Sequence, residues 1–88
     1  MSHRTQDVTD SAIAARLINA LESAADREAA AKTALVSVTI DMLTAADAGQ
    51  IATTLVRKTR TLVFMHAEFV SDAGVRIANA TSVHKLLT

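Results

Sequence analysis

The sequence predicts an α+β protein in which one long helix lies on a four-stranded antiparallel sheet. Residues 10–32 are rich in alanine and carry a helical apolar stripe, whereas residues 34–87 form four apolar segments separated only by short polar turns. Within these segments apolar residues alternate with the period of two that is typical of half-buried strands. Because 88 residues suffice for one domain, we expect a single unit over 1–88 that begins with a polar segment, 1–9.

A helix over residues 10–32 is predicted from the spacing of four apolar residues. They lie at i, i+4, i+8 and i+11, namely Ile13, Leu17, Leu21 and Ala24. This spacing places them along one helical face, which can lie on a sheet. Thr9 or Asp10 is the expected N-cap, because its side-chain oxygen can accept a hydrogen bond from an amide of the first turn. The alanines alongside make the helix slim, so it can approach a sheet closely.

The first two predicted strands are joined by a turn at residues 44–49. In the first strand, Val38 and Ile40 alternate with polar residues, which indicates one buried face. Gly49 in the turn is expected to adopt a left-handed backbone conformation. The second strand, Ile51 to Arg57, then meets the third across a tight connection at Lys58 and Thr59, so these two strands form a hairpin.

The third strand, within residues 60–70, is apolar on both faces. Val63, Met65, Ala67 and Phe69 point to one side, whereas Leu62, Phe64 and Val70 point to the other beside His66 and Glu68. A strand that is apolar on both sides is typically covered on both. Since a single helix covers one face, the cover of the other face must come from another copy of the chain or from another protein. We expect self-association, as a homodimer or a dimer of dimers.

The fourth strand follows a strong turn signal at residues 71–74. Ala78, Ala80 and Ser82 form a row of small side chains on one face, against which we expect the helix to pack. Val75, Ile77 and Val83 are expected on the opposite face. The four strands are predicted to form a meander over residues 34–87, in which each strand pairs with the next one along the chain.

Composition excludes several classes of function. Nine basic residues balance nine acidic ones, so no cationic excess is present to bind nucleic acid. The chain has no cysteine, and its three histidines lack the spacing of metal ligands, so we expect no metal site. No apolar run approaches the ~20 residues of a membrane span, and residues 1–10 do not resemble a signal peptide. A soluble, cytoplasmic protein is therefore expected.

Four stretches resemble the hot-dog-fold thioesterase superfamily, in its branch of phenylacetate-pathway and 4-hydroxybenzoyl-CoA thioesterases. SAIAARLINALESAA is similar to the central helix of that family and VSVTIDMLTAADAG to the strand and loop that follow it. IATTLVRKTRTLVFMHAEFVSDAG resembles the long hairpin with a basic turn, and VRIANATSVHKLL the last strand. Family members usually have a further strand and a glycine-rich turn before the helix, so the resemblance implies an N-terminally shortened member.

The resemblance also implies where a site would lie. Amides at the helix N-terminus, around Asp10 and Ser11, would polarise a thioester carbonyl. The acidic base or nucleophile of the family aligns with Asn19, which cannot act as a base at neutral pH, so Glu22 is the nearest carboxylate that could replace it. Further along, the basic turn formed by Arg57, Lys58 and Arg60 matches a region that can lie near the phosphates of coenzyme A.

The expected function is therefore that of an acyl-CoA thioesterase-like protein, which hydrolyses its substrate weakly in a groove between subunits. No cofactor is expected beyond the coenzyme A of the substrate itself. The alternative is a non-catalytic hot-dog module that binds an acyl ligand or serves only in assembly. The missing glycines before the helix and the shortened N-terminus favour this alternative, and the strands fit both hypotheses.

Overall fold

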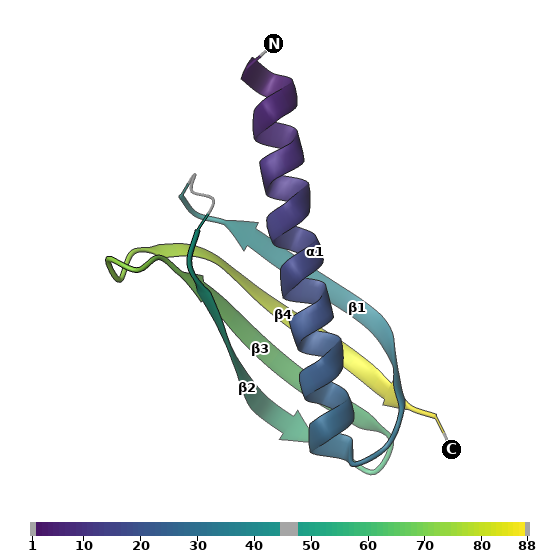
Figure 1. The fold of residues 1–88 in the computed structure, drawn as a ribbon. Helices are drawn as coiled ribbons and strands as arrows, with labels where there is room; N and C mark the ends of the chain where they lie inside the picture. Colours follow the sequence, from purple (N-terminus) through teal and green to yellow (C-terminus); the bar gives the residue numbers. More distant parts are fainter. Residues whose placement is uncertain (1, 45–47, 88) are drawn as a thin grey trace.

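One long helix crosses one face of a four-stranded antiparallel sheet, as the sequence predicts (Figure 1). The computed structural model describes residues 2–44 and 48–87, and side chains from Asp10 onward. The elements in chain order are helix α1 (Ser2–Ala29) and strands β1 (Thr33–Met42), β2 (Gln50–Lys58), β3 (Leu62–Val70) and β4 (Arg76–Leu86). The four strand positions agree closely with those predicted.

The order of the strands in the sheet is β1-β4-β3-β2. The predicted meander is correct for β2, β3 and β4, which are neighbours joined by short turns. It is wrong for β1, which pairs with β4 through a register that includes Ile40 opposite Ala80. The chain therefore crosses from one edge of the sheet to the other between β1 and β2, and both of these strands lie at an edge (Figure 1).

The core lies between α1 and the sheet. The predicted helical stripe is buried, and Leu17 has no exposed surface. Opposite it, every second residue of β3 is buried, and Phe69 is the largest fully buried side chain. Ala78 and Ala80 of β4 belong to the same cluster. The row of small residues thus faces the helix as predicted, because a short side chain lets the two backbones approach closely.

The start of α1 differs from the prediction. The helix begins at Ser2 rather than at Asp10, so neither Thr9 nor Asp10 is its N-cap. Its first turns project beyond the sheet (Figure 1). A helix segment that covers no sheet needs no apolar stripe, and for that reason the polar residues 2–9 gave no periodic signal.

The helix also ends before residue 32, where the sequence placed its end. Ala30 follows the last helical residue with a φ of 52°, a left-handed conformation that commonly ends helices. Asp26 then ties the helix to the first strand, because its Oδ1 accepts hydrogen bonds from the backbone N (2.8 Å) and Oγ1 (2.6 Å) of Thr33.

Ile77 departs from the predicted alternation in β4. The sequence placed it on the face opposite Ala78, yet both residues are fully buried. Phe69 pairs with Ala78 while the next residue, Val70, pairs with Arg76, so Ile77 is the extra residue of a β-bulge. A bulge interrupts the period of two, which explains why alternation alone assigned Ile77 to the wrong face.

Gly49 is required for a reason other than the one predicted. Its φ is not in the left-handed region, whereas Gly74, in the turn between β3 and β4, has a φ of 86°. A Cβ on Gly49 would instead collide with the carbonyl oxygen of Val70 and lie 2.7 Å from Cε1 of Phe69. Residues 45–47, in the rest of the predicted turn, lie outside the described residues.

Gly49→Ala is therefore expected to lower the free energy of unfolding by about 1–3 kcal/mol, since the backbone of β3 must shift to admit the methyl group. Urea denaturation measures this change. Gly74→Ala is the matched control, because no atom lies within 4 Å of a Cβ there and only the left-handed backbone opposes the substitution. A Gly49 variant as stable as the parent would contradict the close approach.

Candidate functional site

The basic hairpin residues lie at the end of the sheet where α1 ends, and they point in different directions. Lys58 Nζ donates a hydrogen bond to the carbonyl oxygen of Glu28, 3.0 Å away in the last turn of α1. The Arg57 guanidinium lies on the other side of the sheet, with its Cζ 5.8 Å from the ring centroid of Phe64. Arg60 is exposed in the turn. The predicted phosphate contacts therefore form a basic end of the molecule rather than a single closed pocket.

The turn that carries Arg60 is held by its own hydrogen bonds. The backbone N of Thr59 donates to the carbonyl oxygen of Leu62 at 2.8 Å. In return, the backbone N of Leu62 donates to Thr59 Oγ1 at 3.0 Å. The guanidinium of Arg60 is thus presented to solvent on a well-connected backbone, as an exposed anion contact requires.

Asp10 and Ser11 do not lie where the resemblance placed them. Because α1 begins at Ser2, the amides around Ser11 are inside the helix, where they donate to carbonyls one turn earlier. In this structure these amides are therefore not free donors for a thioester carbonyl. Ser11 is also far from the basic hairpin. At about 1.5 Å per residue, it lies roughly 25 Å along the helix from Glu28, and Glu28 is the residue that contacts Lys58.

Asn19 and Glu22 are both exposed on α1. Asn19 follows the buried Leu17 by about 200° of helical rotation, so it lies on the side of the helix away from the sheet. Glu22 lies on the flank of the helix, close enough to buried His84 for its charge to act on the imidazole. Within one chain, the structure does not bring Asn19 together with the basic hairpin.

A buried polar pair, Ser82 and His84, is a feature that the sequence analysis did not predict. Ser82 Oγ and His84 Nε2 share a hydrogen bond of 2.7 Å, and the two residues are 3% and 0% exposed. Among the described residues, His84 Nδ1 has no hydrogen-bond partner. Extending the alternation of Ala78, Ala80 and Ser82 by one step would have placed His84 on the helix face.

Burial lowers the pKa of His84 below its ordinary 6.5, because desolvation opposes the charged form more strongly than Glu22 and Asp26 favour it. Hydrogen bonds from the hydroxyl and backbone amide of Thr33 lower the pKa of Asp26 below 3.8. These two shifts affect separate pH ranges. Protonation of His84 affects the stability of the fold below neutral pH, whereas protonation of Asp26 affects it only in strong acid.

The free energy of unfolding is expected to fall as the pH drops below 6.5, the ordinary histidine pKa. The unfolded chain then binds a proton that buried His84 refuses, so the stabilisation present above 6.5 is lost until the folded-state pKa is reached. Each unit of pKa depression corresponds to about 1.4 kcal/mol. Urea denaturation between about pH 7.5 and 5 measures this slope. His84→Gln should reduce this slope, and a slope that survives His84→Gln would assign it to another group.

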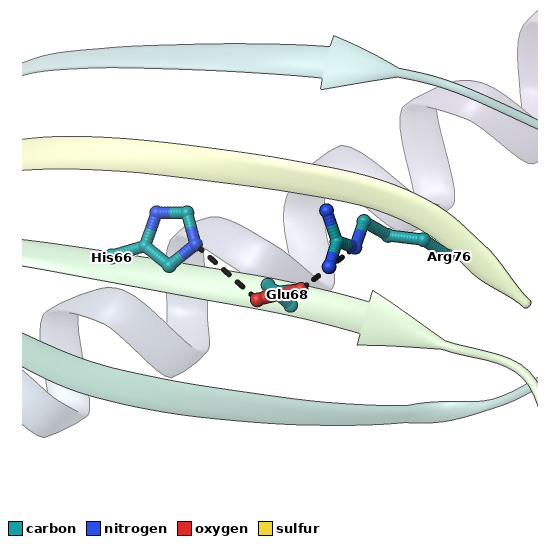
Figure 2. A network of polar contacts seen from close by, with 3 residues as sticks. All are labelled: His66, Glu68 and Arg76. Atoms are coloured by element: carbon teal, nitrogen blue, oxygen red, sulfur yellow. Dashed lines mark ion pairs between the residues drawn. The ribbon is translucent and has the colours of Figure 1, made fainter. Parts of the chain in front are cut away.

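A second polar group lies on the face of the sheet opposite α1 (Figure 2). Glu68 Oε2 is 3.0 Å from Nε of Arg76, and Glu68 Oε1 is 3.7 Å from Nε2 of His66. All three side chains are at least partly exposed. This arrangement is a surface ion pair with a flanking imidazole. Such pairs contribute little to stability, but they set the charge of that end of the sheet.

Other kinds of site find no support in the part of the chain that the structure describes. Among the side chains that the structure describes, those of residues 10–44 and 48–87, no three histidine, aspartate or glutamate groups could together hold a metal ion. The described helix is neither apolar nor uncharged enough over its length to cross a membrane.

No family model and no curated protein sequence matches this chain. Among solved structures, the crystal structure of the BH2602 protein of Bacillus halodurans with CoA has a similar fold, with a TM-score of 0.79. The two sequences are 13% identical, and the match covers 89% of this chain and 54% of that one. The chain thus spans about half the length of this structural neighbour. The comparison supports the hot-dog-like fold class.

Proposed function

We propose that this chain is a hot-dog protein that binds coenzyme A or an acyl-CoA thioester, in a groove completed by a second subunit. The observation that carries the proposal is the similarity of fold to a protein whose crystal structure contains CoA. The basic end of this chain adds a physical reason. Arg60 is exposed and Arg57 lies nearby, and guanidinium groups bind phosphate oxygens through charge-assisted, often bidentate, hydrogen bonds.

Binding without efficient hydrolysis agrees best with the geometry. The helix amides around Ser11 are engaged within α1, so they offer no preformed oxyanion site. Asn19 supplies no general base. Lys58, already bonded to the carbonyl of Glu28, contributes positive charge and holds the hairpin against the helix. The protein therefore has an anion-binding end and lacks two of the groups that acyl transfer needs.

Hydrolysis at Glu22 is the second candidate function. Glu22 is an exposed carboxylate on the flank of α1, and a carboxylate can activate water for attack on a thioester. In this reaction water adds to the carbonyl carbon while Glu22 accepts a proton, and coenzyme A leaves as a thiol after reprotonation. This candidate requires an oxyanion donor from a partner subunit.

Titration calorimetry with coenzyme A tests the proposed binding. Arg60→Gln is expected to weaken the affinity by about 10-fold or more, since a hydrogen bond to a charged group contributes about 1.5–3 kcal/mol. If Arg60 contacts the 3′-phosphate, dephospho-CoA should bind the parent more weakly than coenzyme A does. Arg60→Gln should then reduce the affinity for dephospho-CoA less than it reduces the affinity for coenzyme A.

Arg76→Gln is the matched control, because it removes an exposed guanidinium (63% exposed) from the opposite end of the sheet. The affinity of the Arg76→Gln variant for coenzyme A should equal that of the parent. The absence of measurable binding by the parent chain at millimolar coenzyme A would refute the proposed function. Equal losses for both variants would assign the effect to overall charge rather than to the hairpin.

A further inference from the structure

The last two turns of α1, residues 22–29, called the helix end below, cover a buried histidine of β4. The row of the sheet beneath the helix end takes one residue from each strand, and successive members pair with one another: Lys58, Val63, His84 and Leu35. His84 has no exposed surface, and Glu22 and Asp26 on α1 are close enough for their charges to act on its imidazole. The helix end thus separates this ring from solvent.

The imidazole of His84 has a hydrogen-bond partner at one nitrogen only. Nε2 lies 2.7 Å from Ser82 Oγ, whereas Nδ1 has no partner among the described residues. A charged imidazole donates from both nitrogens, so protonation would leave a buried donor without an acceptor as well as a buried charge. Both are unfavourable. With the helix end on the sheet, the closed arrangement, the ring is therefore held neutral.

Charged groups face this position from α1 and from β2. Oδ1 of Asp26 is already engaged by Thr33, and Glu22 is exposed on the flank of the helix. Because Nδ1 has no partner, neither carboxylate reaches it in the closed arrangement. Lys58 of β2 lies two strands away, with its Nζ bonded to the carbonyl of Glu28. The other two strands present only the apolar members of the row.

The helix end is attached by smaller side chains than the middle of α1. The middle buries Leu17 and Leu21, whereas the helix end buries two alanines, Ala24 and Ala25. Alanine removes much less apolar surface from water than leucine does. The helix then stops at Ala30, whose φ of 52° is a left-handed conformation that opposes any residue with a Cβ. The helix end is therefore the part of α1 that leaves the sheet most readily.

We propose that the helix end is an acid-sensitive cover over His84, which opens locally while the rest of α1 and the sheet stay folded. In the open arrangement the imidazole takes up a proton from water, and it donates hydrogen bonds to water and to the carboxylate of Glu22 or Asp26. The bond from Lys58 to the carbonyl of Glu28 breaks in the same step, because the carbonyl moves away with the helix. Opening thus frees the ammonium group of Lys58 at the basic end of the molecule.

The direction of the response follows from the burial of the ring. Desolvation lowers the pKa of His84 below 6.5 in the closed arrangement, and exposure to water in the open one returns it to its ordinary range. Below pH 6.5 the open arrangement therefore binds a proton that the closed arrangement does not. Uptake of one proton raises the opening equilibrium by up to about 10-fold for each unit by which the pH falls.

Hydrogen exchange of the full chain, followed by NMR for each amide, tests the proposal. Amides of residues 26–29 report the helix end, because their hydrogen bonds lie within its two turns. After correction for intrinsic exchange rates, their opening equilibrium should rise by about 10-fold between pH 7.5 and 5.5. Amides bonded between β3 and β4 should show a larger free energy of exchange at both pH values, since they open only with the whole fold. Equal free energies for the two sets would show global opening and overturn the proposal.

His84→Gln keeps a side chain that can hydrogen-bond to Ser82 but cannot take up a proton, so it should remove the pH dependence at residues 26–29. Ser82→Ala is the matched control, because it removes the partner of Nε2 and leaves the titrating ring in place. This variant should open more at every pH and keep the same dependence. A pH dependence that survives His84→Gln would assign the response to another group and overturn the proposal.

An NMR titration of the His84 ring in the parent keeps the test decisive if a variant fails to fold. Protonation of the ring should accompany the rise in exchange of the helix end. A ring that became protonated near pH 6.5 without any change at residues 26–29 would overturn the proposal. No ligand is present in these measurements, so their outcome is independent of whether the chain binds coenzyme A.

Discussion

Phe69→Ala is expected to lower the free energy of unfolding by about 3–5 kcal/mol. Phe69 is fully buried between α1 and the sheet, and the Arg16 guanidinium lies over its ring, 4.8 Å from the centroid. Truncation leaves a cavity whose walls, in β3 and α1, cannot collapse without breaking strand pairing. A chain of 88 residues has a total stability of about 4–13 kcal/mol, so the variant should be partly or wholly unfolded.

Thermal and urea denaturation followed by circular dichroism measure this loss. Val75→Ala is the control, because Val75 is 49% exposed in the turn between β3 and β4 and its truncation should change stability by about 0.5 kcal/mol or less. If the Phe69 variant had the same melting temperature as the parent, the helix would not be packed on this strand face.

Asn19→Asp is expected to raise the rate of acyl-CoA hydrolysis by about 10²–10⁴-fold from a slow parent rate, provided that residue 19 faces the groove between subunits. The reason is that a carboxylate can accept a proton from water whereas an amide cannot, and a positioned general base contributes about this factor. The initial rate of thiol release from short, aromatic and long acyl-CoAs measures the effect. Glu22→Gln should abolish any residual activity of the parent if Glu22 is the base.

The outcomes separate the two functions that were considered. If the parent hydrolysed acyl-CoA rapidly and neither substitution changed its rate, the catalytic groups would lie elsewhere. No turnover by the parent or either variant, together with coenzyme A binding, would establish the non-catalytic module. Slow or absent turnover is expected, because the helix begins at Ser2 and the amides around Ser11 are therefore not free donors.

The candidate site was only partly accessible from the sequence. The basic turn around Arg60 was identified because three cations within four residues form a local signal that needs no tertiary information. His84 was missed because the alternation of Ala78, Ala80 and Ser82 was not extended to it, and because its full burial depends on the helix that covers this face. Asp10 and Ser11 were misplaced, since a helix terminus is defined by backbone hydrogen bonds rather than by apolar spacing.

By itself the sequence determined the fold class, the positions of the four strands and the side of the helix that is buried. These features follow from local periodicity, because a period of two or 3.6 decides which side chains share a face. The two-sided apolar pattern of β3, with Val63 buried and Phe64 on the other face, is of the same kind. Even the row of Ala78 and Ala80 under the helix could be predicted from side-chain size.

Only the tertiary structure decided that β1 pairs with β4, that Ile77 sits in a bulge and that Gly49 lies against β3. Backbone hydrogen bonds between strands are the same whichever neighbour supplies them, so the choice of partner depends on how α1 and the loops pack over the whole sheet. Gly49 and Ile77 are set by contacts with Phe69 and its neighbours across the sheet. Contacts between residues far apart in the chain leave no periodic trace, and for this reason they appear only once the chain is folded.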